Sequence, residues 1–220
     1  MKKITQAEKA YHIIEELIVT LELKPGQIVS ENELSRQINI GRMPIREALK
    51  RLEFTNLIVT LPQRGVMVKE ITAEEMLKQL EVRTVIERLI VETATKFLND
   101  SEKKRLLELA EQYKEATKQK DVIKALHVDS EFNNLIGLAS RNPYAWQIIS
   151  YLYVVGRRNY YIYYYMDDKL TCDMNYAHID LMKIMVTGDV EKARKQLDYL
   201  LQCTKKLICF QLNELLAQQV

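Results

Sequence analysis

GRMPIREALKRLE, residues 41–53, is the stretch that decides the fold of the first third of the chain. Its apolar residues recur every three or four positions, as on one face of an α-helix, and they are Ile45, Ala48, Leu49 and Leu52. Pro44 is tolerated early in such a helix because its missing N–H would have no helical partner there. The stretch therefore predicts an amphipathic helix from about Arg42 to Phe54.

The opposite side of this helix is polar and basic, with side chains directed away from the apolar face at Arg42, Met43, Arg46, Glu47 and Lys50. Arg36 and Arg51 extend the basic cluster, although the formal net charge of the chain is only +2. A local basic face in a near-neutral protein is typical of a surface that meets nucleic-acid phosphates. The alternative interpretation is an ordinary solvated helix face.

The residues before this stretch predict two more helices. Apolar residues recur at helical spacing from Ala7 to Leu21, and Lys24-Pro25-Gly26 ends that helix. Ser30 and Glu33 have the spacing of a capping box, which opens a short helix that runs through Ile38. Asn39-Ile40-Gly41 then forms a tight turn.

The residues after the stretch predict a β-hairpin. Residues 57–61 and 65–68 are rich in strand-forming side chains, and residues 62–64 join them as a turn. Arg64 and Gly65 fall at the tip, where an arginine reaches the DNA backbone or minor groove. The order predicts a winged helix-turn-helix, with three helices and a hairpin wing, over residues 1–70.

This region resembles the winged helix of GntR-type bacterial transcriptional regulators over about residues 7–70. The matching segments, in order, are PG (25–26), SENEL (30–34), GRMPIREALKRLE (41–53) and RGVMV (64–68). The chain departs from the family at Gly41, where serine or threonine is usual, at Met43, where threonine is usual, and at Asn56, where glycine is usual.

The resemblance implies a sequence-specific regulator, in the role of a repressor, that binds a palindromic double-stranded DNA operator as a homodimer. Arginine paired with guanine is the commonest specific contact in the major groove. The residues expected to contact DNA are Arg36, Arg42, Met43, Arg46, Lys50, Arg64 and Gly65.

Residues 73–220 predict an all-α antiparallel helical bundle, so the fold class is mainly α. Thr72 and Glu75 form a second capping box after a boundary near residues 69–72. Helices are expected at roughly 73–98, 102–119, 121–139, 142–167, 170–187 and 189–217, with short breaks between them.

This second region resembles the FadR-type (FCD) effector domain in its shorter, six-helix form. The resemblance rests on Leu80-Glu81-Val82-Arg83 with Glu87, Asp129 with Phe132, Arg141-Asn142-Pro143, His178, and Gly188-Asp189 with Ala193. It implies dimerisation, a small organic acid as effector, and a divalent metal held by one aspartate and three histidines.

The metal ligands carry over only in part. Asp129 and His178 match, but Asn133 and Leu200 stand where the family has histidines. Imidazole nitrogens provide most of the affinity for Zn or Ni. Two alternatives follow: a weakly bound Zn or Ni at Asp129 and His178, or a metal-free polar pocket floor made of Asp129, Asn133 and His178.

Arg83 and two tyrosines complete the expected effector site. The guanidinium fork of Arg83 suits a ligand carboxylate, and an ion pair with Glu87 one turn later is its simpler role. Eight tyrosines lie within residues 144–165. Tyr160 and Tyr164 share one side of the predicted helix, and our interpretation is that they line the effector cavity. An aromatic cage for a cation is the alternative.

The rest of the sequence excludes other classes of protein. No apolar run approaches the ~20 residues of a membrane span, and residues 1–8 do not predict a signal peptide. Cys172, Cys203 and Cys209 contain no CxxC pair, which favours a reducing cytoplasm. No catalytic motif is present, so we expect a regulator and not an enzyme. A helical adaptor that binds protein through its winged helix is the other alternative.

Overall fold

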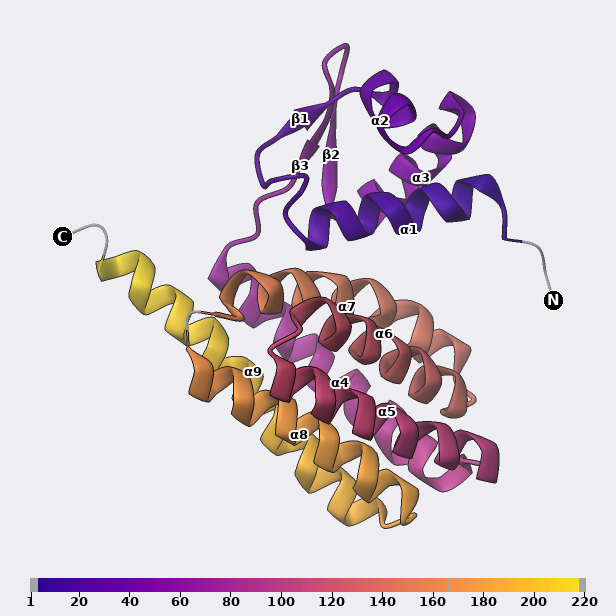
Figure 1. The fold of residues 1–220 in the computed structure, drawn as a ribbon, viewed down its shortest axis with the longest axis vertical. Coiled ribbons are helices and arrows are strands. Elements are labelled where there is room, and N and C mark those ends of the chain that lie inside the picture. The colour runs from indigo at the N-terminus through magenta and orange to yellow at the C-terminus, as the bar shows by residue number, and fades with distance from the viewer. Residues whose placement is uncertain (1–3, 166, 218–220) are drawn as a thin grey trace. The chain divides into compact units, whose positions relative to one another are not determined.

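The computed structural model describes residues 4–165 and 167–217. The chain forms two compact units, the first containing the chain up to Ile71 and the second most of the chain from Thr72 onward. Figure 1 shows the helices and strands of the N-terminal unit in indigo to purple and the helices of the second unit in magenta to yellow. The predicted outer limits of the two domains, residues 1 and 220, lie outside the described residues.

The N-terminal unit is a winged helix-turn-helix, as the sequence predicts. Its elements are α1 (Gln6–Val19), β1 (Ile28–Val29), α2 (Glu31–Ile38), α3 (Arg42–Phe54), β2 (Ile58–Leu61) and β3 (Gly65–Val68). Helix α3 packs on α1 and on α2. The core is apolar and fully buried, with Ala10, Ile14 and Ile18 of α1 and Ile45, Ala48 and Leu52 of α3.

The wing contains a third strand that the sequence analysis did not predict. The sheet has the order β1-β3-β2 and is antiparallel throughout, with Val29 opposite Val66 and Thr60 opposite Val66 on the other side. Strand β1 has only two residues, so it gives no alternating pattern to recognise. Gly65 has a φ of 106°, and a Cβ there would lie 2.4 Å from the carbonyl oxygen of Val29. Its main structural role is therefore this close strand contact.

The turns of the N-terminal unit are set by local hydrogen bonds and by left-handed residues. The Ser30 side chain and Glu33 form a complete capping box at the start of α2. Asn39 ends α2 with a φ of 52°, and the Ser35 hydroxyl donates to the Ile40 carbonyl at 2.6 Å. Asn56, at a φ of 63°, connects α3 to the wing. Asparagine is a residue that adopts this conformation at low cost, as glycine does.

We predict that the left-handed backbone at position 56 favours asparagine or glycine over other residues. Asn56→Ala should lower the free energy of unfolding of the N-terminal unit by about 1 kcal/mol, since a Cβ-bearing residue without a local polar group is strained there. Asn56→Gly should stay within about 0.5 kcal/mol of the wild type. Urea unfolding followed by circular dichroism measures both, with Lys50→Ala on exposed α3 as the control. Equal stability of the Ala and Gly variants would contradict this account.

The second unit consists of six helices within the described residues, as the sequence predicts: α4 (Ala73–Phe97), α5 (Asp100–Gln119), α6 (Val122–Ala139), α7 (Pro143–Tyr163), α8 (Asp168–Val186) and α9 (Val190–Ala217). Helix α4 packs on α6 and α9, α5 packs on α6 and α8, and α8 packs on α9. Figure 1 shows these helices side by side as a bundle. Helix α7 ends at Tyr163, four residues before its predicted end.

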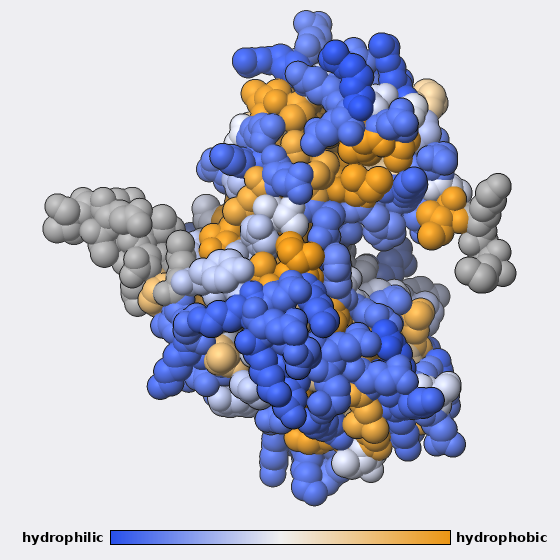
Figure 2. Space-filling view, viewed as in Figure 1, coloured by the Kyte–Doolittle hydropathy of each residue, from blue (hydrophilic) through white to orange (hydrophobic). Residues whose placement is uncertain are grey.

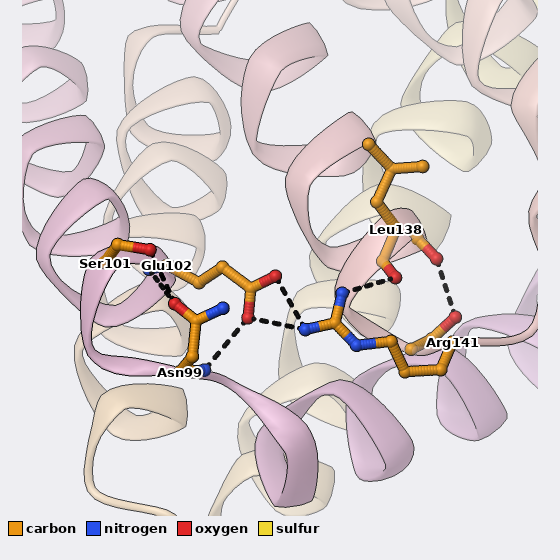
Figure 3. Close-up of polar contacts among 7 residues, drawn as sticks. Asn99, Ser101, Glu102, Leu138 and Arg141 are labelled. Atoms are coloured by element: carbon orange, nitrogen blue, oxygen red, sulfur yellow. Dashed lines mark hydrogen bonds and ion pairs between the residues drawn. The ribbon is translucent and has the colours of Figure 1, made fainter.

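The junction of α5, α6 and α7 explains the Arg141-Asn142-Pro143 segment. Arg141 has a φ of 55° and ends the turn after α6. Its Nη2 donates to both carboxylate oxygens of Glu102, at 2.9 and 3.1 Å (Figure 3). Glu102 Oε2 also accepts a hydrogen bond from the backbone N–H of Asn99, the residue that caps α5. The Asn142 side chain caps α7 and Pro143 follows at its first position. The segment is therefore structural, and it ties the end of α6 to the start of α5.

The surface is mixed in character. In the view of Figure 2 most side chains are hydrophilic and the hydrophobic ones gather in separate patches. None of the helices in the described part of the chain is long and apolar enough to cross a membrane.

Candidate DNA interface and effector site

The exposed side of α3 carries the side chains that the sequence analysis assigned to DNA. Arg42, Arg46 and Lys50 are exposed, and Met43 is 63% exposed. Arg42 opens the helix, after Gly41, which makes no side-chain cap. Met43, Arg46 and Lys50 lie on the side of α3 that is turned away from its buried residues, whereas Arg42 is exposed because it begins the helix. The first turns of α3 therefore offer a basic, solvent-exposed edge.

Arg46 is held by an acidic partner that the sequence analysis missed. Its Nε and Nη2 atoms donate to the Oε1 and Oε2 atoms of Glu31 at 2.9 and 2.8 Å, so the pair is bidentate. Glu31 is the first residue of α2, and the ion pair therefore joins the two helices of the helix-turn-helix. The Arg46 hydrogen bond keeps the pKa of the Glu31 carboxyl below its usual range.

The Glu31 pair leaves part of the Arg46 guanidinium free to bind another group. Arginine has five N–H donors in a fixed plane, and the side-on pair uses one from Nε and one from Nη2. The end of the fork, formed by Nη1 and the second N–H of Nη2, remains. This edge matches the two acceptors of guanine in the major groove.

The other residues assigned to DNA have different surroundings. Arg36 is exposed on α2, and its Nε donates to the Asn32 carbonyl oxygen at 3.3 Å. Arg64 is exposed in the turn between β2 and β3. Arg51, part of the basic cluster in the sequence, instead lies over the Tyr11 ring of α1, 4.2 Å from its centroid. It contributes to packing and not to the exposed edge of α3.

In the second unit, the predicted effector residues meet around Asp129. Asp129 and Asn133 lie one turn apart on α6, and the Asn133 Nδ2 donates to Asp129 Oδ2 at 3.0 Å. His178 of α8 places its Nε2 3.2 Å from Asp129 Oδ1. Both oxygens of the carboxylate thus have partners. Asp129 also raises the pKa of the nearby Tyr113 and Tyr160, although burial is the main cause for both.

The proton positions on His178 follow from its neighbours. Its Nδ1 lies 3.0 Å from the carbonyl oxygen of Met174, which only accepts hydrogen bonds, so Nδ1 carries a proton. Its Nε2 lies 3.2 Å from Asp129 Oδ1, so the ring bridges a backbone carbonyl of α8 and the carboxylate of α6. The His178 ring stacks on Tyr113, with centroids 5.4 Å apart, and meets the edge of Phe132. The imidazole is therefore fixed on all sides.

A chain of hydrogen bonds leads from α5 to an unpaired donor on α8. Tyr113 bonds to Tyr160 of α7, and the Tyr160 hydroxyl donates to Asn175 Oδ1 at 2.8 Å. Asn175 is 0% exposed, and its Nδ2 has no hydrogen-bond partner among the described residues. A buried donor without a partner costs about 1–3 kcal/mol. This atom is a site at which an acceptor atom would stabilise the structure.

Arg83 of α4 lies beside the same cluster. Its Nε donates to Glu87 Oε1 at 2.6 Å, so the predicted ion pair is present, and its Cζ lies 5.3 Å from the centroid of the Tyr153 ring. Burial lowers the pKa of Arg83, but Glu87 and, less strongly, Asp129 outweigh it, so the guanidinium stays charged. A Cβ on Gly156 would lie 2.8 Å from Arg83 Nη1, which shows how closely the guanidinium packs on α7.

The residues present do not fit a tightly bound transition metal. Among the residues that the structure describes, no group of three His, Cys, Asp or Glu side chains is arranged to hold a metal ion. Asn133 and His178 are already bonded to Asp129, and Leu200 is a buried apolar residue. A metal at Asp129 would have to break these contacts and would find only one imidazole, that of His178.

The tyrosine-rich segment divides into packing and polar roles. Tyr160 and Tyr164 are both buried, with ring centroids 5.2 Å apart in an edge-on arrangement. Burial is the first cause that raises the pKa of Tyr164 to about 12. Tyr144 and Tyr165 are instead exposed. Tyr153 and Tyr160 lie close enough to Asp129 for its charge to raise the pKa of both hydroxyls, although burial is the main cause.

Sequence reasoning missed Glu31, Tyr113, Tyr153 and Asn175. Asn175 lies one turn before His178 on α8, and this helical spacing is a signal that could have found it. Tyr113 and Tyr153 come from helices whose packing the sequence did not specify.

Comparison with known proteins gives consistent results for both units. Residues 6–68 match the family "Bacterial regulatory proteins, gntR family", and residues 78–202 match the FCD domain. The HTH-type transcriptional repressor RspR of Escherichia coli K12 is 28% identical over 145 residues, or 66% of this chain and 64% of that protein. The gluconate operon transcriptional repressor of Bacillus licheniformis is 30% identical over 126 residues, or 57% and 51%.

The solved structure titled E. coli McbR/YncC has the same fold, with a TM-score of 0.84 and 21% identity over 95% of this chain and 99% of that one. A GntR regulator from Rhodococcus sp. RHA1 has a TM-score of 0.72, 18% identity, and coverage of 92% and 97%. The match to RspR spans just under two thirds of that repressor, at 64%. The chain belongs to the gntR family of bacterial regulatory proteins and carries an FCD domain behind its winged helix-turn-helix.

Proposed function

We propose that this chain is a dimeric repressor that binds a palindromic operator through α3 and releases or retains it in response to a small organic acid. The observation that carries the proposal is the exposed basic edge of α3, with Arg46 oriented by Glu31. Its site of action would be the bacterial cytoplasm. Relatives named as transcriptional repressors support a regulatory role over a catalytic one.

The DNA-binding part of the proposal follows from the geometry of α3. A recognition helix contacts base edges with its N-terminal residues, and Arg42, Met43 and Arg46 occupy the first two turns of α3. Lys50 and Arg64 are exposed and would bind phosphates of the DNA backbone. One such helix reads only a few base pairs, so two copies on a palindrome are needed for a specific operator.

The effector part follows from the cluster around Asp129. A carboxylate ligand would accept hydrogen bonds from the N–H groups of Arg83 that Glu87 does not use. Hydrogen bonds to charged groups contribute about 1.5–3 kcal/mol each. An oxygen of the same ligand would accept from the unpaired Nδ2 of Asn175. Asp129, Asn133 and His178 would form the polar floor, while Tyr160 and Tyr164 close one side.

Removing the partner of Arg46 should change the specificity of DNA binding. Arg46→Ala should weaken operator binding by about 1–3 kcal/mol and relax the preference at one base pair. Glu31→Gln should raise affinity for scrambled DNA, because a negative charge is lost, and lower the operator-to-scrambled ratio by about tenfold, or ~1.4 kcal/mol. Fluorescence anisotropy at several salt concentrations measures both.

Glu47→Gln is the matched control, because Glu47 is an exposed acid beside Arg46 on α3 and makes no bidentate pair with it. It should raise affinity for both duplexes alike and keep the ratio. If Glu31→Gln gives the same result as Glu47→Gln, then Glu31 acts only as a negative charge and does not orient Arg46.

Arg83 should be required for the response to effector. In the presence of an organic acid found by thermal-shift screening, Arg83→Ala should abolish the ligand's effect on operator binding while the empty protein keeps nearly its full affinity. Arg105→Ala, which removes an arginine paired with Glu108 and Glu131, should respond normally. A response that survives Arg83→Ala but is lost in Tyr160→Phe would instead mean an uncharged ligand held by the tyrosines.

The effector site should work without a tightly bound metal. Elemental analysis of protein purified without chelator should find well under one Zn or Ni per chain. Asn133→His combined with Leu200→His supplies the imidazoles that are missing and should raise Zn content towards one per chain, since three imidazoles and a carboxylate form a complete tetrahedral set. Stoichiometric metal in the wild type that resists dialysis would overturn the proposal.

A further inference from the structure

One face of α4 is apolar at its centre although it is exposed. Val82, Val85 and Leu89 are 48%, 69% and 48% exposed. They continue a stripe along the helix at alternating intervals of four and three residues, which runs through Lys78, Val82, Val85, Leu89, Glu92 and Lys96. This 4-3-4-3-4 spacing is the pattern of a helix that packs along a partner helix.

The charges at the two ends of the stripe are arranged symmetrically with opposite sign. Lys78 lies seven residues before Val85, and Glu92 lies seven residues after it. Glu74 lies eleven residues before Val85, and Lys96 lies eleven residues after it. At about 100° per residue, all of these side chains fall within roughly 20° of the direction of Val85.

This symmetry identifies the partner as a second copy of the same helix. In an antiparallel pair related by a two-fold axis at Val85, each residue meets the one at equal distance on the other side. Lys78 then faces the partner's Glu92, and Glu74 faces the partner's Lys96. Val82 lies three residues before the axis and Leu89 four residues after it, so each lies within one residue of the other across the axis and the apolar residues also come together. A parallel pair would place like charges opposite each other along the whole stripe.

The contacts that these side chains already make are compatible with the pairing. Lys78 Nζ binds Glu74 Oε1 at 2.7 Å within the helix, and both side chains remain mostly exposed. The buried face of α4, which includes Leu80, Ile90 and Ala94, packs into its own bundle. The stripe lies on the other side of the helix, so pairing requires no rearrangement of the core.

We propose that α4 forms the dimer interface by pairing antiparallel with α4 of a second copy, with the two-fold axis at Val85. The proposal rests on the dimer of the proposed function and assigns it to this surface. Residues that lie near the axis meet themselves, whereas those further away meet the residue at the mirrored position. The arrangement therefore makes predictions about single positions.

Light scattering tests the interface in the full chain. The wild type should have about twice the chain mass of 25.8 kDa. Val85→Asp places two carboxylates at the axis and should weaken the dimer at least about a hundredfold, giving a monomer at micromolar concentration. Leu107→Asp changes a residue of α5 that is 44% exposed and should remain a dimer. Circular dichroism would show that both variants keep their helices.

Disulfide formation tests the register, in a background with Cys172→Ser and Cys209→Ser, since the remaining Cys203 is buried. Val85→Cys should form a disulfide-linked dimer on mild oxidation. Val82→Cys alone and Leu89→Cys alone should not, because each copy is too far from itself, but a mixture of the two should crosslink.

The outcomes distinguish failure of the α4 interface from failure of the dimer as a whole. A wild-type monomer would overturn both the dimer and this interface. A dimer that survives Val85→Asp and gives no disulfide at position 85 would leave the dimeric repressor standing and overturn only the α4 pairing. Crosslinking of Val82→Cys alone, without the mixture, would also overturn it, because it requires a parallel pair.

Discussion

The packing of one face of α3 against α1 determines what the N-terminal unit can present to a partner. Ile45, Ala48 and Leu52 are fully buried, and fixing them fixes the direction of every other side chain on the helix. The side chains of Arg42, Arg46 and Lys50 are therefore exposed to solvent. The ion pair with Glu31 adds a second constraint, since it holds Arg46 in one orientation relative to α2.

In the second unit the corresponding constraint is the polar cluster around Asp129. Asp129 lies among groups from α4 to α8, and its carboxylate is bonded to Asn133 and His178. Asn133 and Leu200 stand where the resemblance expects two histidines, and Asn133 is bonded to Asp129 instead. Arg83 supplies a fixed positive charge beside this cluster. In the proposed function this charge would hold the carboxylate of the effector.

Much of the fold could be predicted from the sequence, because amphipathic spacing and helix caps are local signals. Ser30 with Glu33 and Thr72 with Glu75 marked the starts of α2 and α4. Strand β1 was not predicted because two residues show no alternation. The predicted end of α7 was too late because tyrosines continue an apolar pattern beyond Tyr163. Glu31, Tyr113 and Asn175 join their sites through tertiary contacts, which spacing along the chain does not encode.

The central claim is that α3 reads a specific DNA sequence. Selection of bound duplexes from a random-sequence library by the full-length chain, followed by sequencing, tests it most directly. The account predicts enrichment of one two-fold symmetric sequence, and loss of a defined base preference in each half-site when Arg46 is replaced. Recovery of unenriched DNA by the wild type, or the same enriched sequence from the Arg46→Ala variant, would contradict it.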